Sequence, residues 1–96
     1  MPKGLKFSWD LAKAKSNLEK HGISFEEAAT IFADTLAITI LDPDHGEGEE
    51  IREITIGQTA RCRIAVVSHT DRDRKIRIIS ARKADRSESK QYNEDA

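Results

Sequence analysis

The hydrophobic pattern changes period at Leu36, and this change constrains the fold of the 96-residue chain more than any other feature. Before it, apolar residues recur at the i, i+3, i+4, i+7 spacing of a helix; they are Phe25, Ala28, Ala29 and Phe32. After it, apolar residues alternate with polar ones and many are β-branched, which is typical of strands. Helices grouped before strands predict an α+β fold with a helical layer on one face of a meander.

Local signals predict where the two N-terminal helices begin and end. Asp10 is a good N-cap for a helix over Leu11–Lys20, and Gly22 follows as a left-handed stop. Ser24 and Glu27 have the spacing of a capping box for a second helix. Both helices should therefore precede the sheet.

The rest of the chain predicts strands. After a short opening strand at residues 7–10, four strands are expected at Leu36–Leu41, Ile51–Gly57, Arg61–Thr70 and Ile76–Arg82. Short turn-like segments separate them, so they should pair as antiparallel hairpins. A polar helix is expected at Asp85–Asn93. The predicted fold is two helices packed on a mainly antiparallel four-stranded sheet, followed by a short C-terminal helix.

Length and composition predict one domain over residues 1–96 in the cytoplasm. The chain is long enough for one core and too short for two, and it has no linker-like tract. No apolar run approaches the length of a membrane span, and the segment after Met1 lacks the apolar core of a secretory signal. Cys62 is the single cysteine, which fits a reducing compartment and excludes an internal disulfide.

The charges are strongly separated along the sequence although the net charge is −1. Residues 61–83 contain eight basic and two acidic side chains, whereas residues 42–53 contain six acidic and one basic. A local basic region can attract phosphates even in a nearly neutral protein, because ionic screening confines the field to about 10 Å. The equal alternative is that the acidic segment folds beside the basic one and neutralises it.

Arginines among the isoleucines of the last strand point to an anion-binding surface. Arg77 and Arg82 lie within a β-branched run, and a guanidinium in a sheet needs an ionic partner, water or a ligand. Strict alternation places these two arginines on opposite faces of their strand. In the preceding strand, Arg61, Arg63 and His69 share one face. The alternation does not indicate which face of the sheet is open.

The absence of other motifs favours phosphate chemistry without a cofactor or metal. There is no glycine-rich phosphate loop and no nucleophile elbow, and the histidines His21, His45 and His69 are isolated from each other and from Cys62. RNA cleavage needs only a base, an acid and cations that stabilise the phosphorane. The competing explanation is structural: a single arginine is more often ion-paired, and His21 fits a helix C-terminal cap.

Two motifs together resemble the BrnT toxin family. The first is Trp9-Asp10 with the run from Lys20 to Ala28 (KHG-x-SFEEA), and the second is the run from Arg77 to Ala84 (RIISARKA). The resemblance implies a RelE-like ribonuclease fold and a metal-independent endoribonuclease of a type II toxin–antitoxin pair, which halts translation by cutting RNA. It also implies neutralisation by a BrnA-like antitoxin in a heterotetramer of two toxins and two antitoxins, with DNA contacted only through the antitoxin.

Two sets of site residues follow from the strand pattern and from this resemblance. The catalytic set is Glu50, Arg52, His69, Arg77 and Arg82. The RNA-contacting set is Lys20, His21, Arg61, Arg63, Lys83 and Tyr92. Arg63, Arg77 and Arg82 are expected to contact the scissile and flanking phosphates, with Arg52 orienting or neutralising. Glu50 or His69 is expected to transfer a proton, and the choice between base and acid stays open.

Two other functions fit the same residues. The chain could be a non-catalytic interaction module whose basic surface docks an acidic or amphipathic partner. Direct binding of duplex DNA has less support, because the helices carry neither a recognition-helix face nor a basic stripe.

Overall fold

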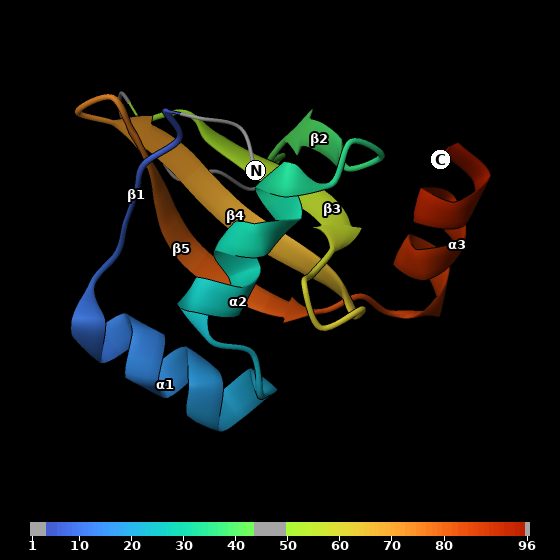
Figure 1. Cartoon of the computed structure of the whole chain (residues 1–96), viewed down its shortest axis with the longest axis horizontal. Helices are drawn as coiled ribbons and strands as arrows, with labels where there is room; N and C mark the ends of the chain where they lie inside the picture. Colours follow the sequence, from blue (N-terminus) through green and yellow to red (C-terminus); the bar gives the residue numbers. More distant parts are fainter. Residues whose placement is uncertain (1–3, 44–49, 96) are drawn as a thin grey trace.

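A computed structural model describes residues 4–43 and 50–95, and its strands form one mixed sheet (Figure 1). The strands are β1 (Phe7–Ser8), β2 (Ile38–Leu41), β3 (Arg52–Gln58), β4 (Ile64–Arg72) and β5 (Lys75–Lys83), in the spatial order β1-β5-β4-β3-β2. β2 to β5 form the expected antiparallel meander. The predicted four-stranded sheet is one strand short, because the expected opening strand, β1, joins the sheet in parallel at the edge of β5. His45 and much of the acidic segment lie outside the described residues.

The N-terminal helices have the predicted caps. α1 (Leu11–His21) begins at Asp10, whose side chain accepts a hydrogen bond from the Lys13 amide, and ends at Gly22, which has a left-handed φ of 71°. α2 (Phe25–Ala29) begins at Ser24 and continues as the 3-10 turn η1 (Thr30–Ala33). α3 (Arg86–Asp95) follows the sheet and lies on the opposite side of the molecule from α1 (Figure 1).

The two sides of the sheet bury different clusters. The larger cluster lies between the sheet and the N-terminal helices and includes Phe25, Ile31, Val67, Ile78 and Ala81. The smaller cluster lies on the other side and consists of Ile56, Val66 and Tyr92 of α3, with partly buried neighbours. The side of the sheet covered by α2 is called the helix-covered face below. The other side, where Arg52, Ser68, Ser80 and Arg82 lie, is called the far face.

A bulge in β5 changes which of its side chains share a face. Ser68 pairs with Ser80, but His69 pairs with Ile78, so Ile79 has no direct partner on β4. Because one residue is skipped, Ile78 and Ala81 both enter the helix-covered core. The prediction that Arg77 and Arg82 lie on opposite faces is therefore wrong, since strict alternation does not hold across a bulge.

The side chain of Asn17 attaches α1 to the edge of β5 that β1 leaves uncovered. Its amide nitrogen donates to the carbonyls of Ala81 (2.8 Å) and Ile23 (3.0 Å), and its oxygen accepts from the Ala81 amide (3.0 Å). The amide thus satisfies both backbone groups of Ala81, as a neighbouring strand would. Nowhere in the described part of the chain is a helix long and apolar enough to cross a membrane.

Candidate nucleic-acid interface

The far face carries arginines in two rows of cross-strand neighbours. Arg52 of β3 pairs with Thr70 of β4, which pairs with Arg77 of β5. Further along the strands, Val66 pairs with Arg82. Directly paired residues in an antiparallel sheet project from the same face, so the three arginines share the far face.

Small hydroxyl side chains lie between these two rows. Ser68 and Ser80 pair directly with each other, and this pair lies between the row that contains Arg77 and the row that contains Arg82. Ser80 is exposed and Ser68 is half-buried. Adjacent strands are about 4.8 Å apart, so the serines leave a shallow hydroxylated strip between the guanidinium groups. A phosphate chain lying on this strip would meet cations on both sides.

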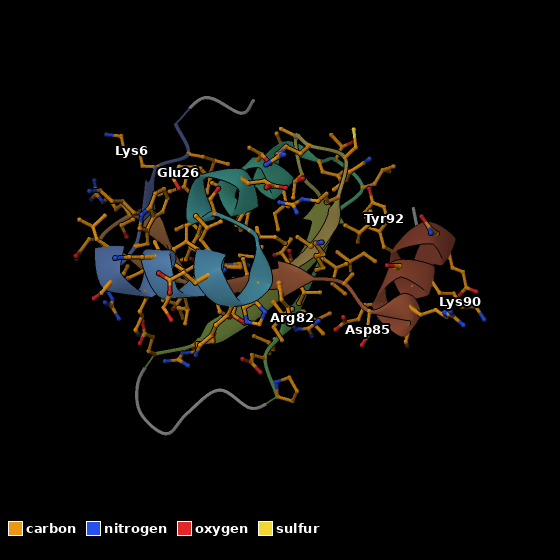
Figure 2. All side chains as sticks on the ribbon, turned by 90° about the horizontal axis from the view of Figure 1, so that it is seen from below. Lys6, Glu26, Arg82, Asp85, Lys90 and Tyr92 are labelled. Atoms are coloured by element: carbon orange, nitrogen blue, oxygen red, sulfur yellow. The ribbon has the colours of Figure 1, made fainter. Side chains whose placement is uncertain are left out.

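Arg82 is oriented by the start of α3. Its two terminal nitrogens donate to the two carboxylate oxygens of Glu88, each at 2.7 Å. Glu88 also accepts from the Asp85 amide, and Asp85 accepts from the Glu88 amide, which is a reciprocal capping box. Figure 2 shows Arg82 near Asp85, at the connection from β5 to α3. The bidentate pair raises the pKa of Arg82 and lowers the pKa of Glu88. The Arg82 side chain is still 44% exposed, so a ligand can reach it.

Arg52 and Arg77 differ from Arg82, because the described part of the chain provides no carboxylate clasp for either of them. Among residues 4–43 and 50–95, neither guanidinium forms an ion pair or hydrogen bond with a carboxylate. The charge of Arg77 does reach Asp10, whose pKa is lowered chiefly by the hydrogen bond from the Lys13 amide. These two cations are therefore available to an anionic ligand.

Lys20 and His21 lie near this strip, at the end of α1. They line a hollow of about 210 Å³ that α1 forms with Ser80 of β5. Glu50 lies at the other end of the strip. It lines a hollow of about 410 Å³ together with Thr70 and two further acidic residues, Glu53 and Asp71, and its carboxylate pairs with Arg72 at 2.5 Å. The arginine strip and its two ends thus bring together six of the predicted residues: Lys20, His21, Glu50, Arg52, Arg77 and Arg82.

Arg63 lies elsewhere, in an ion pair with Glu27 of α2. Its Nε donates to Glu27 at 2.8 Å, one terminal nitrogen contacts the other carboxylate oxygen, and the same nitrogen donates to the Gly22 carbonyl at 3.0 Å. Glu27 is only 6% exposed and also accepts from Thr59 at 2.8 Å. The hydrogen bonds with Arg63 lower the pKa of Glu27. Arg63 therefore fastens α2 to the start of β4, and the exposed Arg61 lies beside the same carboxylate.

His69 is buried in the helix-covered core with 4% exposure. Its Nε2 is 2.7 Å from the Thr55 hydroxyl. The imidazole also packs edge-to-face with the Phe32 ring, with the ring centroids 4.9 Å apart. Burial lowers the pKa of the imidazole, so the neutral form is favoured. Its Nδ1 is buried and has no partner in the described part of the chain. The structure therefore does not bring His69 to the surface that carries Arg77 and Arg82.

Neither Tyr92 nor Lys83 brings its polar group to the arginine strip, although the Tyr92 ring packs in the far-face cluster with Val66. The Tyr92 hydroxyl donates to Asp34 at 2.6 Å, and this bond raises the pKa of Tyr92 to about 12. Burial acts to raise the pKa of Asp34, but the hydrogen bonds from Gln58, Tyr92 and Leu36 outweigh it and lower that pKa. Lys83 pairs with Ala65 and projects from the helix-covered side of β5. Tyr92 therefore anchors α3, and its hydroxyl proton is held in the hydrogen bond to Asp34.

The sequence reasoning missed the residues that shape the strip. Ser68 and Ser80 gave no signal, because serine in a strand has no distinctive pattern. Nor did the sequence pattern assign a role to Glu88, which is the partner of Arg82. Asn17 and Lys13 share the polar face of α1 with Lys20, and that spacing is a signal that could have located the hollow. In residues 4–43 and 50–95, no group of three His, Cys, Asp or Glu side chains could hold a metal ion.

Comparison with known proteins agrees with this architecture. A family model described as the ribonuclease toxin BrnT of type II toxin–antitoxin systems matches residues 9–88. The crystal structure of the ribonuclease toxin BrnT from Brucella abortus superposes with a TM-score of 0.61 at 22% identity, covering 85% of this chain and 99% of that chain. At that identity the superposition shows a shared fold. No curated protein matches the sequence. Because the family model spans most of its length, the chain belongs to the BrnT family of ribonuclease toxins of type II toxin–antitoxin systems.

Proposed function

We propose that the chain is a metal-independent endoribonuclease that acts in the cytoplasm, and that the far face of the sheet holds the RNA strand. The observation that carries the proposal is the β5 bulge, which puts Arg77 and Arg82 on one face with Arg52. These arginines surround a strip of serines, and two of the arginines, Arg52 and Arg77, have no carboxylate partner among the described residues. Family membership supports RNA as the substrate.

The proposed reaction uses the RNA's own 2′-hydroxyl as nucleophile. The 2′-oxygen loses its proton and bonds to the adjacent phosphorus, the bond to the 5′-oxygen breaks, and that oxygen takes up a proton. Arg77 and Arg82 are placed to stabilise the extra negative charge of the phosphorane, because fixed guanidinium groups require little reorganisation as charge develops. The products are a 2′,3′-cyclic phosphate and a 5′-hydroxyl.

Glu50 is the proposed proton-transfer group. It lines a hollow with Thr70, and Thr70 lies between Arg52 and Arg77 in the cross-strand row. The other predicted group, His69, lies on the opposite side of the sheet and is buried. The placement of Arg52 beside Thr70 suits the expected role of neutralising a phosphate near Glu50.

We further propose that the antitoxin partner is BrnA-like and neutralises the enzyme by covering the far face. Type II membership implies an antitoxin. The far face offers cations to an acidic segment of a partner, so one protein could block RNA without contacting any other surface. A tetramer of two toxins and two antitoxins, with DNA contacts made by the antitoxin, fits this arrangement.

The experiment is to incubate the purified chain, free of its partner, with a defined RNA in EDTA and to identify the new ends by mass spectrometry. The proposal predicts cleavage with 2′,3′-cyclic phosphate ends. Cleavage only after Mg²⁺ is added would contradict the mechanism. If RNA is bound but never cut in either condition, the non-catalytic interaction module would be the better account.

A further inference from the structure

We propose that the hollow between α1 and β5 is a second phosphate subsite, which binds an RNA backbone phosphate next to the scissile one. The inference rests on the proposed function and extends it to a part of the molecule outside the arginine strip. The hollow has a volume of about 210 Å³. Its polar lining is formed by Lys13, Ser16, Asn17, Lys20 and His21 of α1 and by Ser80 of β5.

The chemistry of this lining suits a phosphate. Lys13 and Lys20 each contribute a positive charge, and the hydroxyls of Ser16 and Ser80 can donate hydrogen bonds to phosphate oxygens. His21 lies in the last turn of α1, and its ring nitrogens can form hydrogen bonds with a phosphate. Of the described residues that line the hollow, none is acidic. An anion in the hollow would therefore meet cations and donors, while the carboxylate of Asp10, which accepts from the Lys13 amide, lies outside the lining.

The hollow is continuous with the proposed active strip through Ser80. That residue lines the hollow and also pairs with Ser68 between the rows of Arg77 and Arg82. An RNA strand that contacts Arg77 or Arg82 can thus reach the hollow with a neighbouring phosphate.

Asn17 makes the hollow a fixed feature of the fold. Its buried amide forms the floor and holds Ala81, the residue after Ser80, through two hydrogen bonds of 2.8 and 3.0 Å. A third bond, to the Ile23 carbonyl, holds the segment that follows α1. The separation of α1 from β5 is therefore set before any ligand arrives, which reduces the entropy lost on binding.

The test compares two double variants that lose the same number of lysines. Lys13→Ala/Lys20→Ala removes the cations of the hollow. Lys15→Ala/Lys90→Ala is the control, because Lys15 lies two residues from Lys13 on another side of α1 and Lys90 lies on α3. All these lysines are exposed, so folding should be retained, which circular dichroism checks. The probe is an uncleavable single-stranded DNA analogue of the RNA substrate, with binding measured by fluorescence anisotropy over a range of salt concentrations.

The hollow variant is expected to bind the probe roughly tenfold more weakly, and the slope of log affinity against log salt should fall by about 0.7 for the lost phosphate contact. In RNA cleavage its KM should rise while kcat stays near the parental value, because the flanking phosphate is bound equally in the ground and transition states. The amide resonances of Ser16 and Ser80 should shift when the probe binds. The control variant should resemble the parent in all three measurements.

The outcome separates this inference from the proposed function. If the parent cuts RNA but the hollow and control variants share one KM and one salt slope, the hollow is not a subsite and the proposed function stands. If the parent neither binds the probe nor cuts RNA, both fail. Unchanged Ser16 and Ser80 resonances on binding would place the strand elsewhere and overturn the inference even if the affinity falls.

Discussion

Replacing Glu27 by Gln tests whether Arg63 has a structural role. The carboxylate of Glu27 is 6% exposed and accepts hydrogen bonds from the Arg63 guanidinium and from Thr59. Gln keeps the size of the side chain but removes the charge. One bond from Arg63 is therefore weakened, and the other is lost, because the NH2 group of Gln cannot accept a hydrogen bond. Each such change costs about 1 kcal/mol, which gives a loss of about 2 kcal/mol in the free energy of unfolding.

A loss of that size should be easy to measure by urea denaturation at neutral pH. In a domain of this length it corresponds to a fall in Tm of about 10 °C. Glu26→Gln is the matched control, because Glu26 is the exposed neighbour on the same helix. Glu27→Ala should cost more, about 3 kcal/mol, since it leaves the partly buried Arg63 without an anion.

The pH dependence provides a second check on the same ion pair. Hydrogen bonds from Arg63 lower the pKa of Glu27 below its ordinary 4.5, so the unfolded state binds the proton first as pH falls. The stabilisation is therefore fully present above about pH 4.5 and is lost as the pH falls through the folded-state pKa. The stability difference between the parent and Glu27→Gln should shrink in acid. If the parent, Glu26→Gln and Glu27→Gln are equally stable at neutral pH, the ion pair is absent in solution and Arg63 is free to bind RNA.

Three further perturbations have defined outcomes. Burial lowers the pKa of His69, so the unfolded state takes up the proton first and the free energy of unfolding should fall as the pH drops below about 6.5. His69→Phe should remove this pH dependence, as measured by urea denaturation at several pH values. An unchanged pH dependence would assign it to another group. Glu88→Gln weakens the ion pair with the partly exposed Arg82 and should tighten RNA binding about threefold in anisotropy assays. Weaker binding would instead mean that Glu88 holds Arg82 in the orientation that binds RNA. Asn17→Ala leaves backbone groups of β5 without partners and should cost about 3 kcal/mol by urea denaturation; a loss no larger than that of Asn93→Ala would refute the role of Asn17.

The elements that the sequence predicted well are those specified by nearby residues. Asp10, Gly22 and Ser24 act as caps within one turn of their own helices, so the local pattern suffices. β1 is different. It has only two residues, and its place in the sheet depends on parallel pairing with β5, about seventy residues later. No local pattern encodes a contact at that separation.

The bulge in β5 also could not be predicted, and it decides the composition of the far face. The run of Ile78 and Ile79 fits an uninterrupted strand, and the register shift arises from packing Ile78 and Ala81 together against the helices. Packing of this kind depends on side chains from several elements. The candidate site was consequently predicted with the right arginines in β5 and the wrong arrangement.

The sequence did group Arg63 and His69 correctly with Ala65 and Val67. What it could not decide was that this face is the one the helices cover. Glu27 illustrates the reason, because its spacing from Ser24 predicts a reciprocal capping box. In the structure its carboxylate binds Arg63 instead. A distant partner therefore competes with the local one, and only the folded arrangement decides the outcome.

The most direct test of the central claim is the single-turnover rate of RNA cleavage in EDTA for three arginine variants. Arg77→Ala and Arg82→Ala remove cations from the far face, and Arg61→Ala removes an exposed arginine on the other side of the molecule. The account predicts that the first two variants are slower by roughly a hundredfold, while Arg61→Ala cuts at the parental rate. Equal rates for Arg61→Ala, Arg77→Ala and the parent would contradict it.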